Sequence, residues 1–349
     1  MRSNLTRRDF LKLGALGLAS LAFRPTYDFG ELQDGENLAR VAVESVSVHS
    51  QPDENSRILF QRYRDEVVNV YYDEISDGAP KYNPLWHRVW GGYIHSAHMQ
   101  KVQVRLQPVQ TQILDEPHIA EITVPFSQCY LHRKENDWQP IYRLYYESVH
   151  WVVGVVDGPD GTLWYRIKDE MLTDDNLNYY VPARHVRFVG LSELTPIHPD
   201  VPAEQKRVEV SIPRQELIAY EGDSVVLKTK ISSGLHVQHA GQVPWDTPIG
   251  KFFVQSKMPS KHMGEGLLTD DLNAYILPGV PWTSFFETTN GVAFHGTYWH
   301  NNFGVPMSHG CINMRMDEAK WIFRWLTPQA DLSKMNTIGQ GTLVKILDE

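Results

Sequence analysis

One cysteine and three histidines lie close together near the C-terminal end of the sequence and could carry out nucleophilic chemistry. Cys311 follows His295, His300 and His309 within a span of 17 residues. A free thiol has a pKa of about 8.5 and is mostly protonated at neutral pH, so a base that takes its proton makes it a better nucleophile. A histidine within hydrogen-bond reach can act as this base. Gly310, directly before the thiol, would let backbone N–H groups turn towards a developing oxyanion.

Two other interpretations of the same residues compete with nucleophilic catalysis. The three histidines and Cys311 could ligate zinc, although zinc motifs normally show short paired spacings such as C-x2-C or H-x3-H. The spacing alone leaves this alternative open. A core of buried histidines fits less well, because the run Ser308–Cys311 is polar and contains a glycine. The second cysteine, Cys129, lies far away and is interpreted as a buried small hydrophobe, so a disulfide framework is not expected.

The elements that would position these residues are mostly β-strands. Val208, Val210 and Ile212 alternate with polar residues, and a second alternating run at 225–231 follows a turn at 221–223. A period of two with an intervening turn predicts a β-hairpin. Alternation at the C-terminus, over 343–347, predicts a closing strand.

One helix is expected between the cysteine and the closing strand. Its apolar residues recur at helical spacing, with Asp317 as the N-cap and Pro328 as the stop. The apolar stripe consists of Ala319, Ile322, Phe323 and Leu326.

Residues 256–289 precede His295 and predict a functional loop or lid over the cysteine, because the segment is long and contains several Gly and Pro residues. Its aromatic residues Tyr275 and Trp282 could simply pack the loop, and this interpretation remains open beside any functional role.

The N-terminal half contains an internal repeat over residues 38–105 and 119–190. Each copy carries Leu-Trp-x-Arg followed by a Tyr and, five residues later, a His: His98 in the first copy and His185 in the second. Short β-rich runs broken by turn residues predict small β-barrels. The units resemble bacterial SH3-like domains, and their aromatic residues could bind cell-wall peptides or form the core. Residues 191–205 contain several prolines and predict a stiff linker.

Residues 1–35 are interpreted as an export signal and leader. Arg7 and Arg8 precede Phe10, and a short apolar stretch with small residues follows. A basic segment followed by a short apolar segment is typical of a secretory signal, and the paired arginines resemble a twin-arginine signal. We therefore expect export to the cell envelope, with membrane contact only through this segment if it is not cleaved.

The composition excludes two other classes of protein. A formal net charge of -9 argues against nucleic-acid binding, which needs a basic surface. No apolar run beyond the N-terminus is as long as the roughly 18 residues that a membrane helix needs.

The motif around Cys311 resembles that of a known enzyme family. His295-Gly296, followed by Ser308-His309-Gly310-Cys311-Ile312-Asn313, is similar to the catalytic motif of YkuD-type L,D-transpeptidases. Residues 246–252 resemble the family's Thr-Pro-x-Gly-x-Phe strand, and residues 215–220 resemble its first hairpin. The resemblance covers residues 206–347. Together with the repeat, it implies a mainly β protein, in which two small SH3-like β-barrels are followed by an L,D-transpeptidase β-sandwich domain with one main helix.

The resemblance also implies roles for individual residues. Cys311 would be the nucleophile and His295 its base, oriented by a backbone carbonyl at Gly296. His309 would shape the pocket, and the N–H groups of Gly310 and Cys311 would hold the oxyanion. The remaining implied substrate contacts are Ser308, Asn313, Arg315, Tyr298, Tyr275, Trp282 and His262, although Arg315 could instead form a salt bridge.

The implied reaction is acyl transfer through a thioester, without a metal or organic cofactor. Cys311 would attack an L,D peptide bond of a peptidoglycan tetrapeptide stem, and an amine of a second stem would resolve the thioester to give a 3-3 crosslink. Two alternatives remain open: an L,D-carboxypeptidase of the same fold, in which water resolves the thioester, and a non-catalytic wall-binding protein built on the two repeats.

Overall fold

The computed structural model describes residues 37–112, 117–132, 138–171, 178–238, 244–264 and 266–349. The predicted export signal at 1–35 lies outside the described residues. Strands dominate the described chain, which contains one α-helix, and the mainly β prediction is confirmed. No helix among the described residues combines the length and apolarity that crossing a membrane requires.

The first β unit contains a three-stranded and a five-stranded sheet. The smaller sheet has the order β4-β1-β8, and the larger one β3-β2-β7-β6-β5. Their buried side chains share one apolar cluster that includes Val48, Ile94 and Met99. The strands are β1 (Leu38–Val41), β2 (Ser45–His49), β3 (Ile58–Tyr63), β4 (Val67–Asn69), β5 (Tyr72–Ile75), β6 (Leu85–Val89), β7 (Gly92–His95) and β8 (Met99–Val102).

The second β unit is a seven-stranded sheet of order β11-β10-β14-β13-β12-β9-β15. Its core contains Cys129, which is fully buried as expected, and burial raises the pKa of that thiol. The strands are β9 (His118–Ile122), β10 (Phe126–His132), β11 (Trp138–Tyr145), β12 (Val149–Asp157), β13 (Leu163–Lys168), β14 (Asn178–Pro182) and β15 (Val186–Phe188).

The predicted repeat has the same element order in both copies. In the first copy β6 and β7 are followed by a 3-10 turn at Ser96–His98 and then by β8. In the second copy β13 and β14 are followed by a 3-10 turn at Ala183–His185 and then by β15. Trp86 and Trp164 occupy corresponding strand positions, and both are fully buried. These tryptophans therefore form the core rather than a binding surface.

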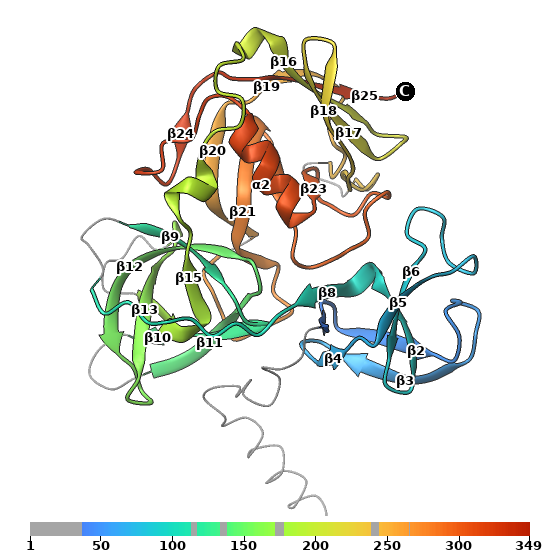
Figure 1. Ribbon diagram of the computed structural model, residues 1–349, viewed down its shortest axis with the longest axis vertical. Helices are drawn as coiled ribbons and strands as arrows, with labels where there is room; N and C mark the ends of the chain where they lie inside the picture. The colour runs from blue at the N-terminus through green and yellow to red at the C-terminus, as the bar shows by residue number, and fades with distance from the viewer. Residues whose placement is uncertain (1–36, 113–116, 133–137, 172–177, 239–243, 265) are drawn as a thin grey trace, which may run out of the picture.

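The C-terminal unit consists of two five-stranded sheets and one helix. The first sheet has the order β18-β17-β16-β25-β19, and the second β23-β22-β21-β20-β24. Figure 1 shows α2 (Met316–Trp325) lying across the second sheet. The strands are β16 (Lys206–Ser211), β17 (Glu216–Glu221), β18 (Ser224–Lys230), β19 (Gly250–Phe253), β20 (Ser256–Gly264), β21 (Ile276–Glu287), β22 (Val292–Gly296), β23 (Ile312–Met314), β24 (Thr337–Ile338) and β25 (Leu343–Leu347).

The predicted hairpin and helix stripe agree with this unit. Val208 and Val210 of β16 face the core, and β17 pairs antiparallel with both β16 and β18. The helix, however, begins at Met316 after Arg315, so Asp317 lies in the first turn and is not the cap. There the negative charge of Asp317 still interacts favourably with the positive end of the helix dipole. The four residues of the predicted stripe are buried: Ala319, Ile322, Phe323 and Leu326.

The predicted loop at 256–289 is instead a long β-hairpin. β20 and β21 pair from Ser256↔Phe285 to Gly264↔Ile276, with a register shift between Lys261 and Met263. Glycines and prolines suggested a loop, but all of them except Gly266 lie within the two strands, where bulges accommodate the irregular backbone. We call residues 256–287 the lid hairpin.

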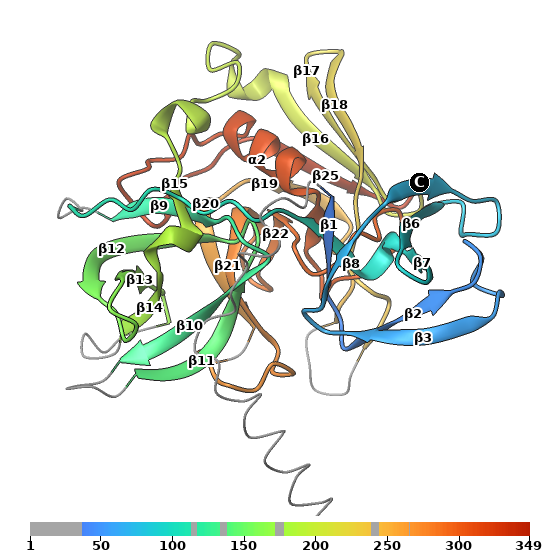
Figure 2. The same cartoon turned by 60° about the horizontal axis from the view of Figure 1, so that its bottom comes forward.

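The two β units flank the C-terminal unit, as Figures 1 and 2 show. The linker that follows β15 packs on α2: Ile197 N–H donates to the carbonyl of Arg324, and Arg324 Nε donates to that of Thr195. Lys206, which is almost fully buried, donates to the carbonyl of Trp325 at the end of α2. The linker is therefore docked on the C-terminal end of the helix.

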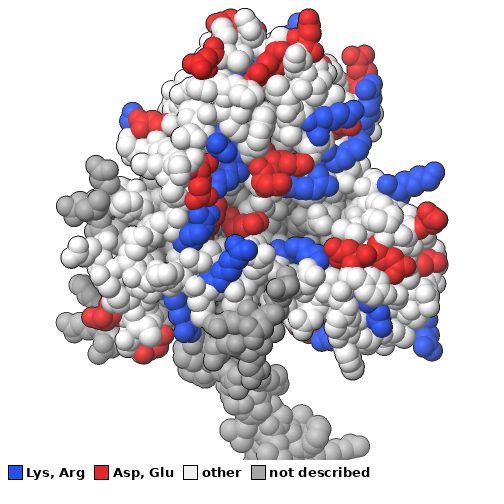
Figure 3. All heavy atoms as spheres, in the orientation of Figure 1, with Lys and Arg blue, Asp and Glu red and all other residues white. Residues whose placement is uncertain are grey.

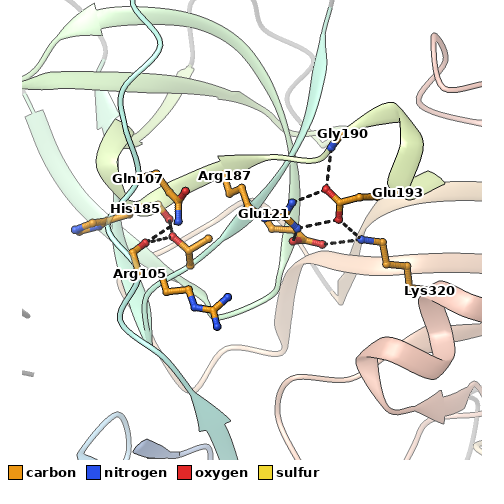
Figure 4. Close-up of polar contacts among 9 residues, drawn as sticks. Arg105, Gln107, Glu121, His185, Arg187, Gly190, Glu193 and Lys320 are labelled. Carbon is orange, nitrogen blue, oxygen red and sulfur yellow. Dashed lines mark hydrogen bonds and ion pairs between the residues drawn. The ribbon is translucent and has the colours of Figure 1, made fainter. Parts of the chain in front are cut away.

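A cluster of four charged side chains joins the second β unit, the linker and α2 (Figure 4). Arg187 pairs with Glu121 and, at 2.5 Å, with Glu193. Lys320 of α2 lies 2.9 Å from Glu193 and 3.7 Å from Glu121. Glu147 lies nearby and forms no ion pair with any described residue. Burial and the charges of Glu121 and Asp317 raise its pKa to about 7, and Lys320 and Arg105 oppose this only partly.

We expect Glu147→Gln to stabilise the protein at pH 8 and to leave its stability unchanged at pH 4. The folded pKa of about 7 lies above the unfolded value of about 4.3, so ionisation favours unfolding increasingly between these two values. The gain in free energy of unfolding at pH 8 should be on the order of 1–2 kcal/mol by denaturant titration.

Glu193→Gln is the control, for which the effect on stability should have the opposite sign. Although burial opposes ionisation of Glu193, hydrogen bonds from Arg187 and Lys320 lower its pKa to about 2, so its loss should destabilise at pH 8. Equal effects of Glu147→Gln at both pH values would contradict the expectation.

Candidate active site

Parallel pairing of β22 and β23 brings the predicted nucleophile and base to one face of a sheet. The register pairs Phe294 with Ile312 and His295 with Asn313. Alternate residues of a strand point to opposite faces. Phe294 and Ile312 are fully buried in the core. His295, Asn313 and Cys311, which directly precedes β23, therefore share the other face, where all three line one cleft.

The loop before Cys311 is held by its own side chains and by the Thr-Pro-x-Gly segment. Ser308 Oγ donates to the carbonyl of Cys311 at 2.5 Å and accepts the Gly310 N–H at 3.1 Å. Thr247 Oγ1 donates to the carbonyl of Gly310 at 2.7 Å. Gly310 has a φ of 119°, a conformation that side chains other than glycine rarely adopt. The predicted role of the Gly310 N–H in an oxyanion site does not fit this arrangement, because Ser308 already accepts it.

The imidazole of His295 is oriented by the Gly296 carbonyl, as the family resemblance implied. Its Nδ1 lies 3.0 Å from the carbonyl of Gly296, so Nδ1 carries the proton and Nε2 is left as the basic nitrogen. Gly296 has this role through its carbonyl and does not itself line the cleft. Burial lowers the pKa of His295 to about 4, and the hydrogen bond to Gly296 opposes this only partly.

Cys311 is a neutral thiol in this environment. It is partly accessible from the cleft and its Sγ lies 3.5 Å from the carbonyl of Gly291. The surrounding protein desolvates the thiolate and raises the pKa of Cys311 to about 11. With the His295 pKa depressed at the same time, the resting site contains a thiol and a neutral imidazole rather than a thiolate–imidazolium pair.

The cleft has a volume of about 610 Å³ and is lined by residues of all three units. Seven residues predicted from the sequence line it: Cys311, His295, His309, Ser308, Asn313, Tyr275 and His262. Ala42, Val43 and Arg64 come from the first β unit, and Met171 comes from the second. The units before residue 206 thus form part of the cleft wall.

Two aromatic rings enclose His309 beside the thiol. The ring centroids of Trp245 and His309 are 3.9 Å apart, and those of Tyr275 and His309 are 4.6 Å apart. Burial lowers the pKa of His309. His309 therefore acts as part of the pocket wall, as predicted, and stays neutral at physiological pH.

The second β unit holds the lid hairpin in place through hydrogen bonds. His262 Nδ1 lies 2.8 Å from Asp169 Oδ2, and Glu170 Oε1 accepts hydrogen bonds from Lys261 Nζ at 2.7 Å and from the His262 N–H at 2.6 Å. Ser260 Oγ donates to the carbonyl of Val149 at 2.5 Å. The lid strand β20 is therefore anchored where it borders the cleft.

Three predicted substrate contacts lie elsewhere. Trp282 is buried at 2% exposure and packs on Phe323 of α2, which is the alternative that the sequence left open. Tyr298 is also buried, and its hydroxyl donates to the carbonyl of Pro278 at 2.9 Å. Arg315 pairs with Glu318 at 3.5 Å and lies over the ring of Phe303. These three residues support the walls of the site and do not line the cleft.

His300, which the zinc alternative required, is engaged with neighbouring amides. Its Nδ1 accepts the Asn302 N–H at 3.1 Å, and its Nε2 lies 2.8 Å from the Asn313 amide. Among the described residues, no group of three or more His, Cys, Asp or Glu side chains could hold a metal ion. His300 therefore positions Asn313 rather than contributing a ligand beside Cys311.

The residues of the site that were not singled out from the sequence include Arg64, Asp169 and Trp245. Arg64 and Asp169 belong to the N-terminal repeat copies, more than 90 residues before the motif, and no local pattern links them to Cys311. Trp245 lies two residues before Thr247 of the Thr-Pro-x-Gly segment and could have been considered together with that segment.

The comparison with known protein families agrees with this geometry. Residues 205–346 match the family model of YkuD, the L,D-transpeptidase catalytic domain. This segment of the chain is a YkuD-type L,D-transpeptidase catalytic domain. The match spans both sheets and α2, together with Cys311 and His295. No match occurs among curated proteins.

Solved structures of L,D-transpeptidases are also similar over part of the chain. An L,D-transpeptidase from Xylanimonas cellulosilytica is 25% identical over 41% of this chain and 60% of its own, with a TM-score of 0.30. The catalytic domain of an E. faecium L,D-transpeptidase is 27% identical over 41% of this chain and 98% of its own, with a TM-score of 0.29. The assignment depends on the family match, since TM-scores of this size add nothing to it.

We expect the alkylation rate of Cys311 by iodoacetamide to rise about tenfold per pH unit between pH 6 and pH 9, without a plateau. The reason is that only the thiolate reacts, and a pKa of about 11 keeps its fraction small throughout this range. Mass spectrometry of the labelled peptide follows the rate, and Cys311→Ala serves as the blank. A rate that is already constant between pH 6 and pH 8 would instead indicate a resting thiolate–imidazolium pair.

Proposed function

We propose that the protein is an exported L,D-transpeptidase that acts on peptidoglycan peptide stems. The observation that carries the proposal is the YkuD-type domain at 205–346, in which Cys311 and His295 line the same cleft. The basic Nε2 of His295 and the partly accessible thiol suit a nucleophile–base pair.

The first half-reaction is acylation of Cys311. His295 Nε2 takes the thiol proton while Sγ attacks the carbonyl of the L,D peptide bond of a tetrapeptide stem. The terminal D-residue leaves as an amine after accepting that proton from the imidazolium, and a thioester remains. Because the resting groups are neutral, proton transfer accompanies formation of the C–S bond rather than preceding it.

The second half-reaction resolves the thioester. A side-chain amine of a second stem attacks the thioester carbonyl, His295 accepts its excess proton, and the thiol is regenerated with formation of a 3-3 crosslink. The chemistry uses only groups of the chain and the two stems. Substrates of this kind lie outside the cytoplasm, which agrees with the proposed twin-arginine export signal at 1–35.

We expect Cys311→Ala to abolish 3-3 dimer formation from a tetrapeptide-containing disaccharide substrate, measured by mass spectrometry of the products. His295→Gln should lower the rate by about 100-fold or more, since general-base catalysis contributes roughly that factor. Cys129→Ala is the matched thiol control, and should retain transfer because Cys129 lies in the core of the second β unit.

The products also distinguish transfer from hydrolysis. Tripeptide stems without dimers would indicate an L,D-carboxypeptidase, and the transfer proposal would then be wrong. Release of no terminal residue by the wild-type protein would contradict both activities and favour a binding protein.

A further inference from the structure

A residue of the first β unit forms part of the cleft wall opposite the catalytic motif. Arg64 follows β3 and lines both the cleft and an adjoining pocket of about 170 Å³. Tyr275, Leu277 and Trp299 line the same two spaces. Arg64 therefore lies where the cleft continues beyond the thiol.

The backbone at Arg64 is fixed by its neighbour Asp65. Asp65 adopts a φ of 65° and its carboxylate is almost fully buried. That carboxylate pairs with Arg40 at 2.8 Å and with Arg143 of the second β unit at 2.5 Å. The Arg40 guanidinium also lies 4.0 Å from the ring centroid of Tyr145. The turn that carries Arg64 is thus held where the two β units meet, and Asp65 is neutralised by its own two partners.

The first β unit is also bound directly to the catalytic domain. Asn83 Nδ2 donates to the carbonyl of Asn301 at 3.0 Å, and the Asn301 N–H donates to the carbonyl of Ala97 at 2.8 Å. Arg40 Nη2 donates to the carbonyl of Tyr298 at 3.2 Å. Arg64 itself donates one hydrogen bond to the carbonyl of Leu272 in the lid hairpin. These contacts place the guanidinium at the cleft before any ligand arrives.

The cleft is basic although the chain is acidic. Its lining residues include Arg64 and Lys261 and no Asp or Glu, whereas acidic and basic side chains are interleaved over the outer face in Figure 3. Lys261 pairs with Glu170 at 2.7 Å. Arg64 forms no ion pair with any described residue, and its planar guanidinium has five N–H donors, of which the Leu272 carbonyl uses one. An unpaired guanidinium in a cleft is suited to a carboxylate, which it can bind in bidentate fashion.

We propose that Arg64 binds a carboxylate of the peptide stem, so that the first β unit supplies a specificity-determining residue to the catalytic domain. This inference rests on the proposed function. Two carboxylates of a stem have the required chemistry: the C-terminal carboxylate of the fourth residue, and the side-chain carboxylate of a diamino diacid at the third position. Arg64 selects stems that retain that carboxylate over stems in which it is amidated or missing.

Calorimetric binding of synthetic tetrapeptide stems to the full-length Cys311→Ala protein tests the inference without requiring turnover. Three stems are compared: one with both carboxylates, one with a C-terminal carboxamide, and one with lysine in place of the diamino diacid. The Cys311→Ala protein should bind the first stem roughly 10–100-fold more tightly than the stem that lacks the recognised carboxylate. Adding Arg64→Gln should remove this preference, whereas adding Arg62→Gln, which breaks an ion pair with Glu66 away from the cleft, should preserve it.

The outcomes separate a binding role from a structural one. Loss of the Leu272 contact would weaken all three stems equally, and an equal loss would therefore overturn the inference. Unchanged discrimination in Arg64→Gln, or no binding of any stem by the Cys311→Ala protein, would overturn it as well. If discrimination depends on Arg64 but the wild-type protein does not turn over the stems, the proposed reaction fails while the carboxylate site stands.

Discussion

The site depends on the parallel pairing of β22 with β23. This register places Phe294 and Ile312 in the core and His295 and Asn313 in the cleft. A shift of β22 by one residue would move His295 into the core and Phe294 into the cleft. A shift of β23 would exchange Asn313 and Ile312 in the same way. Burial of those apolar residues therefore also fixes the catalytic face, and no separate device is needed to align His295 with the strand that follows Cys311.

The two N-terminal β units hold the segments on either side of this strand pair. The first unit binds the connection between His295 and Cys311 through Asn83 and Arg40. Gly304 lies in that connection, and the Cβ atom of any other residue at this position would lie 3.0 Å from Tyr82 Cβ. The second unit binds the lid hairpin through Asp169 and Glu170. Both walls of the cleft are consequently positioned by elements outside the matched family segment. For this reason the cleft is lined by residues from outside that segment as well as from within it.

Local patterns predicted what is set by neighbouring residues, and missed what is set by distant ones. The hairpin of β17 and β18 and the buried stripe of α2 follow from sequence neighbours. The hydrogen bond of His295 to Gly296 was implied by the family resemblance. The family resemblance implied that Trp282 contacts a substrate, but its side chain is buried and packs on Phe323. Arg64 and Asp169 could not be linked to the cysteine, since only the docking of the three units brings them to the cleft.

The neutral state of the catalytic pair sets a condition on the chemistry. Transfer of a proton from a thiol with a pKa of about 11 to an imidazole with a pKa of about 4 is unfavourable in free energy. A carboxylate bound at Arg64 would neutralise the one cation of the described cleft lining that forms no ion pair, so substrate binding by itself would not stabilise a thiolate. The negative charge has to pass directly to the carbonyl oxygen as the C–S bond forms, and donors aimed at that oxygen then determine the barrier. The Gly310 N–H is not such a donor in this arrangement, because Ser308 Oγ accepts it.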